Sequence, residues 1–251
     1  MTPPFRPDMI LRLGSLIDAH GITFLSSVPA LWHLALKLSP APGGRTLERV
    51  HVGSAPLGAA LWRDVQQWAG IREVWNAYGI TETGSWVAGT SGGAFAPADG
   101  LIGPPWGAEI RIARAAGPAP PLAPDQAAAP GAAGPVWLRT AGLMRGYLDR
   151  PDLTAAVVRD GWFATGDVGC LDERGWLHLS GRERDEINKS GLKVHPADID
   201  LLVAGFPGVA DVCTFGVEDR LHGQEVAIAV VLEDEGDAAL AALYRWLRQR
   251  A

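Results

Sequence analysis

The chain has 251 residues, of which 47% are hydrophobic, and it carries a formal net charge of −6. This share of apolar residues excludes a mostly disordered chain, and the length suffices for a large domain together with a small one. The acidic balance provides no basic surface for a nucleic-acid backbone, so we expect no nucleic-acid partner.

The first forty residues predict a helix, a strand and a second helix. Apolar residues at helical spacing cover about 8–20, and Gly21 stands where a helix C-cap would. Residues 22–25 form an apolar run typical of a buried strand. Pro29 suits the first turn of the next helix, which we expect to continue through Leu38.

The next forty residues predict a strand, a helix and a strand joined by short loops. The strands cover 47–52 and 72–76, and Pro56 is expected in the first turn of the helix between them. Ligands of such βαβ units bind at the carboxyl ends of the strands. Residues 53–55 and 78–82 both follow a strand end, so we expect a binding site there.

The residue types at these strand ends suit a nucleotide. A glycine followed by two small residues lets the backbone approach a planar ring, and Tyr78 offers an aromatic face. Thr81 has a hydroxyl for a phosphate oxygen, and Glu82 has a hard oxygen ligand for Mg²⁺. The alternative is that Tyr78 and Gly79 form an ordinary strand-ending turn and that Glu82 is a solvated carboxylate.

A second polar stretch lies between residues 162 and 196. Asp167 follows the pair Thr165-Gly166, and Arg182 follows Gly181. A carboxylate can accept both hydroxyls of a ribose, and a nearby guanidinium can donate to the sugar or to a phosphate. This stretch is therefore a second candidate for nucleotide binding.

The remaining pattern predicts two further structural units. Strand signals around 109–112 and 136–139 indicate a small antiparallel, barrel-like subdomain over 95–181, and 115–135 is predicted to be a loop. Two strands and a closing helix indicate a small α+β unit over 182–251.

The cysteines and the amino-terminal segment indicate where in the cell the protein is located. Cys170 and Cys213 are too far apart for a CxxC motif or for zinc-ligand spacing. The amino-terminal segment lacks the apolar region of a signal peptide, and no apolar run is long enough to span a bilayer. We therefore expect a cytoplasmic protein with no membrane partner.

Four ordered motifs, GSAPL, YGITE, WFATGD and GRERDEINKSGLKVHPADID, together resemble the adenylate-forming (AMP-binding) superfamily, in its acyl-CoA-synthetase-like branch. The resemblance implies ATP-dependent activation of a carboxylic acid to an acyl-adenylate. Transfer of the acyl group to the thiol of coenzyme A, or to the phosphopantetheine thiol of a carrier protein, would follow. The implied fold is a partial adenylate-forming enzyme fold: an α/β part over 1–94, the β-barrel-like subdomain over 95–181, and the small α+β C-terminal domain over 182–251 after a hinge.

The resemblance also implies roles for individual residues. Thr81 would contact the α-phosphate and Glu82 would hold Mg²⁺, both as catalytic residues. Asp167 would bind the ribose with Arg182 beside it, Arg182 also acting in catalysis, and Arg184 would be the hinge. The nucleotide pocket would be lined by Gly53, Ser54, Ala55, Pro56, Asn76, Ala77, Tyr78 and Gly79.

Other positions have weaker implied roles. Gly191 would lie in a loop that moves in for the thioester step. The walls of the acyl site could include Val28, Pro29, Trp32 and Trp86, with ordinary packing as the alternative.

Two expected elements of the superfamily are missing from the sequence. We find no Ser/Thr/Gly-rich phosphate loop ending in lysine before Ile22, and no catalytic lysine near Ala251. Losing one such electrostatic group typically slows a reaction on the order of 10²- to 10³-fold. We therefore expect a chain truncated at both ends, impaired in adenylation, that self-associates or needs a complementary amino-terminal fragment.

Two alternatives remain open. The first is a non-catalytic remnant that binds AMP, an acyl-adenylate or a partner protein. The second, a dinucleotide-binding βαβ protein, is weakened because Gly53 is followed by Ser54-Ala55-Pro56 and no GxGxxG motif opens a helix.

Overall fold

The computed structural model describes residues 7–114, 127–189, 192–219, 223–233 and 237–250. They divide into two compact units, which we describe separately. The first unit contains residues up to 165 together with 170–179, and the second contains 166–169 together with the residues from 180 onward.

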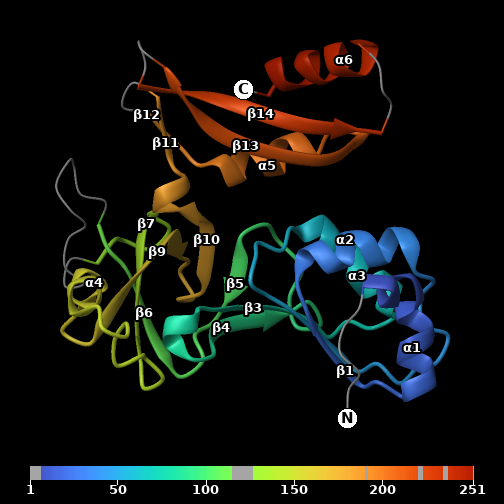
Figure 1. Ribbon diagram of the computed structural model, residues 1–251, viewed down its shortest axis with the longest axis horizontal. Coiled ribbons are helices and arrows are strands. Elements are labelled where there is room, and N and C mark those ends of the chain that lie inside the picture. The colour runs from blue at the N-terminus through green and yellow to red at the C-terminus, as the bar shows by residue number, and fades with distance from the viewer. Residues whose placement is uncertain (1–6, 115–126, 190–191, 220–222, 234–236, 251) are drawn as a thin grey trace. The chain divides into compact units, whose positions relative to one another are not determined.

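The first sheet lies in the first unit (Figure 1). Its strands, in spatial order, are β1 (Phe24–Ser27), β2 (Arg49–Val52), β3 (Val74–Gly79) and β4 (Trp86–Ser91). The pairs β1–β2 and β2–β3 are parallel, whereas β4 runs antiparallel to β3. The carboxyl ends of the three parallel strands therefore lie at the same edge of the sheet.

Helices cover one face of this sheet. They are η1 (Pro7–Arg12), α1 (Leu13–His20), α2 (Pro29–Leu38) and α3 (Ala59–Ala69). Residues of all four helices share one buried cluster with Val50, Val52 and Val74 of the strands. Gly21 ends α1 in the left-handed region at φ 57°, and Pro29 is the first residue of α2, as the sequence predicts.

Several predicted boundaries in this unit are wrong. The strands β2 and β3 begin at Arg49 and Val74 rather than at residues 47 and 72, and β3 continues to Gly79 rather than ending at residue 76. The first strand begins at Phe24 rather than at residue 22, because the amide of Ile22 still bonds to the carbonyl of Ile17 and closes α1. Pro56 lies before the helix rather than in its first turn. The helix begins at Ala59, whose amide donates to Asp99 Oδ1 at 2.7 Å. This cap comes from a segment 40 residues away, which local sequence patterns cannot reveal.

The second sheet has six strands. They are β5 (Leu101–Gly103), β6 (Ala108–Ile112), β7 (Gly134–Thr140), β8 (Val158–Arg159), β9 (Trp162–Leu171) and β10 (Leu177–Arg182). Their order is β5-β10-β9-β7-β6, with β8 paired to β9. Two short helices, η2 (Thr81–Thr83) and α4 (Pro151–Val157), complete this part of the chain. Part of the predicted 115–135 loop lies outside the described residues.

The turn between β9 and β10 is organised by Asp172. Its Oδ1 accepts the amides of Arg174 and Trp176, each at 2.9 Å, and its Oδ2 accepts the Arg174 guanidinium at 2.7 Å. Burial acts to raise the pKa of Asp172, but these hydrogen bonds outweigh it and lower the pKa to about 2.

The carboxyl-terminal part is a small α+β unit (Figure 1). Its elements are η3 (Glu183–Asp185), β11 (Ile187–Lys189), β12 (Leu192–Val194), α5 (Pro196–Ala204), β13 (Val209–Asp219), β14 (Gly223–Leu232) and α6 (Asp237–Arg248). The strand order is β12-β11-β14-β13. The predicted fold class, α/β with a β-rich subdomain and a small α+β part, is confirmed. None of the described helices is long and apolar enough to cross a bilayer.

Candidate functional site

The GSAP loop, which we define as residues 53–56, follows β2 at the edge where the parallel strands end. Gly53 is buried, and its amide donates to the carbonyl of Ser27 at 3.1 Å. A Cβ at Gly53 would lie 3.0 Å from the carbonyl oxygen of Ala77, so a larger residue would press on β3. Ser54, at φ 67°, turns the chain so that residues 54–56 are exposed.

The end of β3 lies next to this loop because Val52 pairs with Asn76. Asn76 is 3% exposed, and its Nδ2 donates to the carbonyl of Leu101 at 2.7 Å, so this amide group braces β5. Ala77 and Tyr78 are also buried, Tyr78 in a core that it shares with residues of β5, β6, β7 and β10. The structure thus brings the GSAP loop and residues 76–77 together.

Thr81 and Glu82 follow in η2. Thr81 is exposed, whereas Glu82 is partly buried. The hydroxyl of Tyr147 donates to Glu82 Oε1 at 2.7 Å, and the amide of Met144 donates to the Glu82 carbonyl at 2.7 Å. Two bonds from one loop therefore hold the backbone and the side chain of Glu82 in place.

The Asp167–Arg182 pair belongs to the second unit. Asp167 lies on β9 with 5% of its side chain exposed, and Arg182 ends β10 with 65% exposed. Nε of Arg182 donates to Oδ1 of Asp167 at 3.0 Å. A carboxylate that is fixed in this way can still accept several hydrogen bonds, and the guanidinium reaches solvent where an anion could meet it.

The predicted hinge lies directly after this pair. Arg184 is the middle residue of η3, and its side chain lies outside the described part of the structure. Gly191, which the resemblance places in a mobile loop, also lies outside the described residues. Both roles stay predictions.

The helix η2 offers a divalent cation one carboxylate ligand, that of Glu82. Among the described residues, no three His, Cys, Asp or Glu side chains gather to form a protein-only metal site. Mg²⁺ characteristically uses one or two carboxylates and completes its shell with water and phosphate oxygens. The Glu82 carboxylate, oriented by Tyr147, fits that kind of shared site.

The proposed acyl-site residues have different surroundings. Trp32 is fully buried in the helix-facing core, and its Nε1 donates to Ser27 Oγ at 2.6 Å, so it has a packing role. Val28 is 40% exposed at the start of α2. Trp86 lies on the other face of the sheet, where its ring centroid is 4.5 Å from that of His51.

The end of β4 and the turn after it match the sequence motif that surrounds the nucleophilic serine of many hydrolases. Residues 89–93 match G-x-S-x-G with Ser91 at the centre. Ser91 is 3% exposed, its hydroxyl donates to Glu73 at 2.9 Å, and it accepts the amide of Gly93 at 2.9 Å. These bonds give Ser91 a structural role in a turn.

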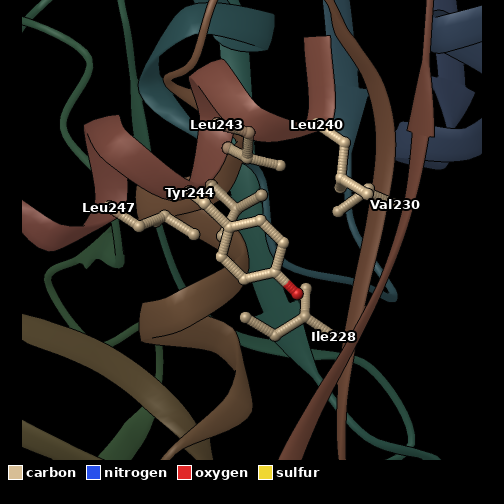
Figure 2. A pocket seen from close by; sticks show the side chains of 7 residues that line it. Ile228, Val230, Leu240, Leu243, Tyr244 and Leu247 are labelled. Atoms are coloured by element: carbon tan, nitrogen blue, oxygen red, sulfur yellow. The ribbon is translucent and has the colours of Figure 1, made fainter. Parts of the chain in front are cut away.

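A small apolar hollow lies in the carboxyl-terminal unit between α6 and β14 (Figure 2). Its volume is about 60 Å³, which is room for a few water-sized molecules at most. The lining residues are Val203, Ile228, Val230, Leu240, Leu243, Tyr244 and Leu247. Because the lining offers only aliphatic side chains and one tyrosine, we assign the hollow to imperfect packing of α6 on the sheet.

Sequence reasoning missed Tyr147 and His51. Tyr147 is 65 residues from its partner Glu82, and its only sequence signal is its place in the segment GLMRGYLDRPDLT that the resemblance covers. His51 is one residue from the end of β2, and the strand alternation places it on the face opposite Val50 and Val52.

Comparison with known proteins gives the chain a family. The family model described as "AMP-binding enzyme" matches residues 1–148, which is more than half of the chain. A probable CoA ligase, CCL9 from Humulus lupulus, is 32% identical over 215 residues, covering 83% of this chain and 39% of that protein. The fatty acid–[acyl-carrier-protein] ligase ScoC from Streptomyces coeruleorubidus is 33% identical, covering 86% of this chain and 41% of that protein.

A solved structure has a similar fold. The ATP-bound MatB from Rhodopseudomonas palustris superimposes with a TM-score of 0.80 at 26% identity, covering all of this chain and 48% of that one. The chain therefore spans less than half the length of the relatives named here. With the family match and the ordered loops in place, this chain belongs to the AMP-binding enzyme family, whose relatives include acyl and CoA ligases.

Proposed function

We propose that this chain forms part of an acid–thiol ligase that activates a carboxylic acid as its acyl-adenylate and transfers the acyl group to a thiol. The observation that carries the proposal is the pair of fixed carboxylates: Glu82 held by Tyr147, and Asp167 held by Arg182. Both stand at positions where the sequence resembles the superfamily's nucleotide motifs, and membership of the AMP-binding enzyme family supports the same reading.

On the nucleotide side, the residues of the chain bind and orient. We propose that the exposed backbone of residues 54–56 lies against the adenine ring, while Gly53 lets the loop pack closely on Ala77 of β3. Asn76, Ala77, Tyr78 and Gly79 support this loop from β3, and Asp167 accepts the two ribose hydroxyls.

Around the phosphate, the chain offers a hydroxyl, a carboxylate and a guanidinium. We propose that Thr81 donates to the α-phosphate, that Glu82 holds Mg²⁺, and that Arg182 stabilises the charge that develops there. Bound Mg²⁺ would draw negative charge from the phosphate oxygens and so favour attack by the acid. Tyr147 keeps the Glu82 carboxylate in one orientation for this purpose.

The acceptor is a pantetheine thiol, carried either by coenzyme A or by a carrier protein. One relative is named as a CoA ligase and another as a fatty acid–[acyl-carrier-protein] ligase, so relatives of both kinds support the thiol class. Arg184 is our candidate for the hinge of this second step. Because ATP and coenzyme A are cytoplasmic metabolites, we also propose a cytoplasmic location.

We propose that a phosphate loop and a catalytic lysine come from polypeptide outside these 251 residues. The sequence contains lysine only at Lys37, Lys189 and Lys193, none in a Ser/Thr/Gly-rich loop. Among the described strands, β1 is at the end of its sheet, and its Phe24 is 48% exposed, which favours pairing with a complementary fragment or a second copy. Sedimentation of the chain as a compact, stable monomer would contradict this association.

A second candidate function is binding of AMP or an acyl-adenylate without turnover. It is favoured by the same lack of a phosphate loop within the 251 residues. The two functions differ in pyrophosphate exchange with a panel of carboxylic acids, measured with and without a complementary fragment. Exchange that appears only with the fragment supports the ligase. AMP binding with no exchange in either mixture supports the binding protein, and no AMP binding at all contradicts both.

A further inference from the structure

The face of the first sheet that the helices leave uncovered carries a run of aromatic rings, which we call the aromatic face. Each of its four strands contributes a ring, and a tryptophan that follows β5 extends the run. Ring centroids are 4.5 to 5.8 Å apart between neighbours. The members of the aromatic face are Phe24, His51, Trp75, Trp86 and Trp106.

His51 is at the centre of the aromatic face and has two unmet hydrogen-bonding groups. Its ring contacts Phe24 edge-on at 4.9 Å, and it contacts Trp86 at 4.5 Å and Trp75 at 5.8 Å. Both ring nitrogens are shielded from solvent, and no described residue offers a hydrogen-bond partner to either one. Buried polar groups are almost always paired, so a water molecule or a ligand from outside the chain would supply the missing partner.

The protonation state of His51 narrows the chemistry of that partner. Burial, and then the nearby charge of Arg49, lowers the pKa of His51 below its ordinary value, so the ring is neutral at physiological pH. A neutral imidazole has one N–H donor and one acceptor nitrogen. A hydroxyl can pair with one of these nitrogens in either tautomer, because it donates to the acceptor nitrogen or accepts from the N–H.

The aromatic face adjoins the GSAP loop. Gly53 is two residues after His51, and a Cβ at Gly53 would lie 3.8 Å from Nε1 of Trp86. A flat molecule on the aromatic face would therefore extend toward the loop that we propose holds the nucleotide. Trp86 and His51 are both partly exposed, so a ligand can reach this part of the aromatic face.

We propose that the carboxylic acid of this chain is an aromatic acid bearing a hydroxyl group on its ring, stacked on Trp75 and Trp86 with the hydroxyl bonded to His51. The inference rests on the proposed function, since it names the substrate class of that same site. An aliphatic acid could lie on the rings, but it would leave both nitrogens of His51 unpaired. His51 is thus a specificity-determining residue.

The test is a binding comparison with the full 251-residue chain. Four acids of similar size are titrated with and without AMP: 4-hydroxybenzoate, benzoate, cyclohexanecarboxylate and hexanoate. We expect 4-hydroxybenzoate to bind roughly tenfold more tightly than benzoate, and benzoate more tightly than the two saturated acids. The variant His51→Leu should bind 4-hydroxybenzoate and benzoate equally, whereas the exposed His33, changed to Leu, should keep the preference.

A second measurement does not depend on a substitution at the site. Ring ¹⁵N shifts of His51 in the wild-type chain should move toward hydrogen-bonded values with 4-hydroxybenzoate and stay in place with benzoate. Equal affinity for the two acids, a preference for hexanoate, binding of none of them, or an unchanged ratio in His51→Leu would overturn the proposal. Because AMP is titrated separately, failure of nucleotide binding is recognised independently of failure in acid selection.

Discussion

The contact between Tyr147 and Glu82 predicts a specific energetic coupling. Changing Tyr147 to Phe removes only the hydroxyl that donates to Glu82 Oε1 at 2.7 Å. The loop keeps its backbone bond from Met144 to the Glu82 carbonyl, and the amide of Tyr147 keeps its bond to Thr154 Oγ1 at 2.9 Å. The variant should therefore fold, and its effect should report on the orientation of Glu82 alone.

The size of the effect follows from the geometry. A hydrogen bond to a charged group contributes roughly 1.5–3 kcal/mol when buried, and the partial exposure of both side chains reduces the expected coupling to about 1 kcal/mol. A double-mutant cycle of Tyr147→Phe and Glu82→Ala, read by urea unfolding with tryptophan fluorescence, measures it. The same variant should weaken binding of AMP with Mg²⁺ about fivefold and leave binding without Mg²⁺ unchanged.

The control is Tyr244→Phe, at a tyrosine of α6 that is 61% exposed and far along the chain from η2. It should change neither the unfolding free energy nor the affinity for AMP. Additive effects of the two substitutions at Tyr147 and Glu82, within about 0.3 kcal/mol, would refute the reasoning.

Three further predictions concern other parts of the structure. Asp172→Asn keeps an acceptor for the turn amides but loses the charge, so above pH 3.8 it should lower the free energy of unfolding by up to about 1 kcal/mol. The difference between the variant and the native chain should disappear as the pH falls toward 2, and urea unfolding across that range measures it. In a thiol-reagent titration at pH 8, Cys213 should react well before Cys170. Cys213 is exposed, whereas the pKa of the Cys170 thiol is raised by burial and, secondly, by the charge of Asp172. Equal reaction rates of the two thiols would contradict this prediction. Asp99→Ala removes the cap of α3 and should cost about 1 kcal/mol of unfolding free energy, whereas an unchanged midpoint would show that water replaces the cap.

Local chemistry made much of the fold predictable from the sequence. Gly21 and Pro29 mark helix ends because backbone conformation and the missing proline N–H act within one turn. The order of strands and helices up to β3 follows from periodicity, as do β13, β14 and the final helix of the carboxyl-terminal part. The short strands β4, β11 and β12 were not predicted. The ordered motifs were sufficient for the family assignment, which the comparison with known proteins confirms.

Contacts between distant segments were not predictable. Asp99 caps α3 from 40 residues away, so the local preference of Pro56 for a helix start was misleading. Tyr147 reaches Glu82 only after the chain has folded. The orphaned nitrogens of His51 depend on three rings from three other strands, so no spacing rule could reveal them.

The most direct test of nucleotide binding compares two nucleotides on two proteins. AMP and 2′,3′-dideoxy-AMP are titrated calorimetrically into the 251-residue chain and into its Asp167→Asn variant. If Asp167 receives the ribose hydroxyls, the native chain should prefer AMP about tenfold, and the variant should bind both nucleotides equally. A chain that binds neither nucleotide, or a preference for AMP that survives in Asp167→Asn, would contradict the account.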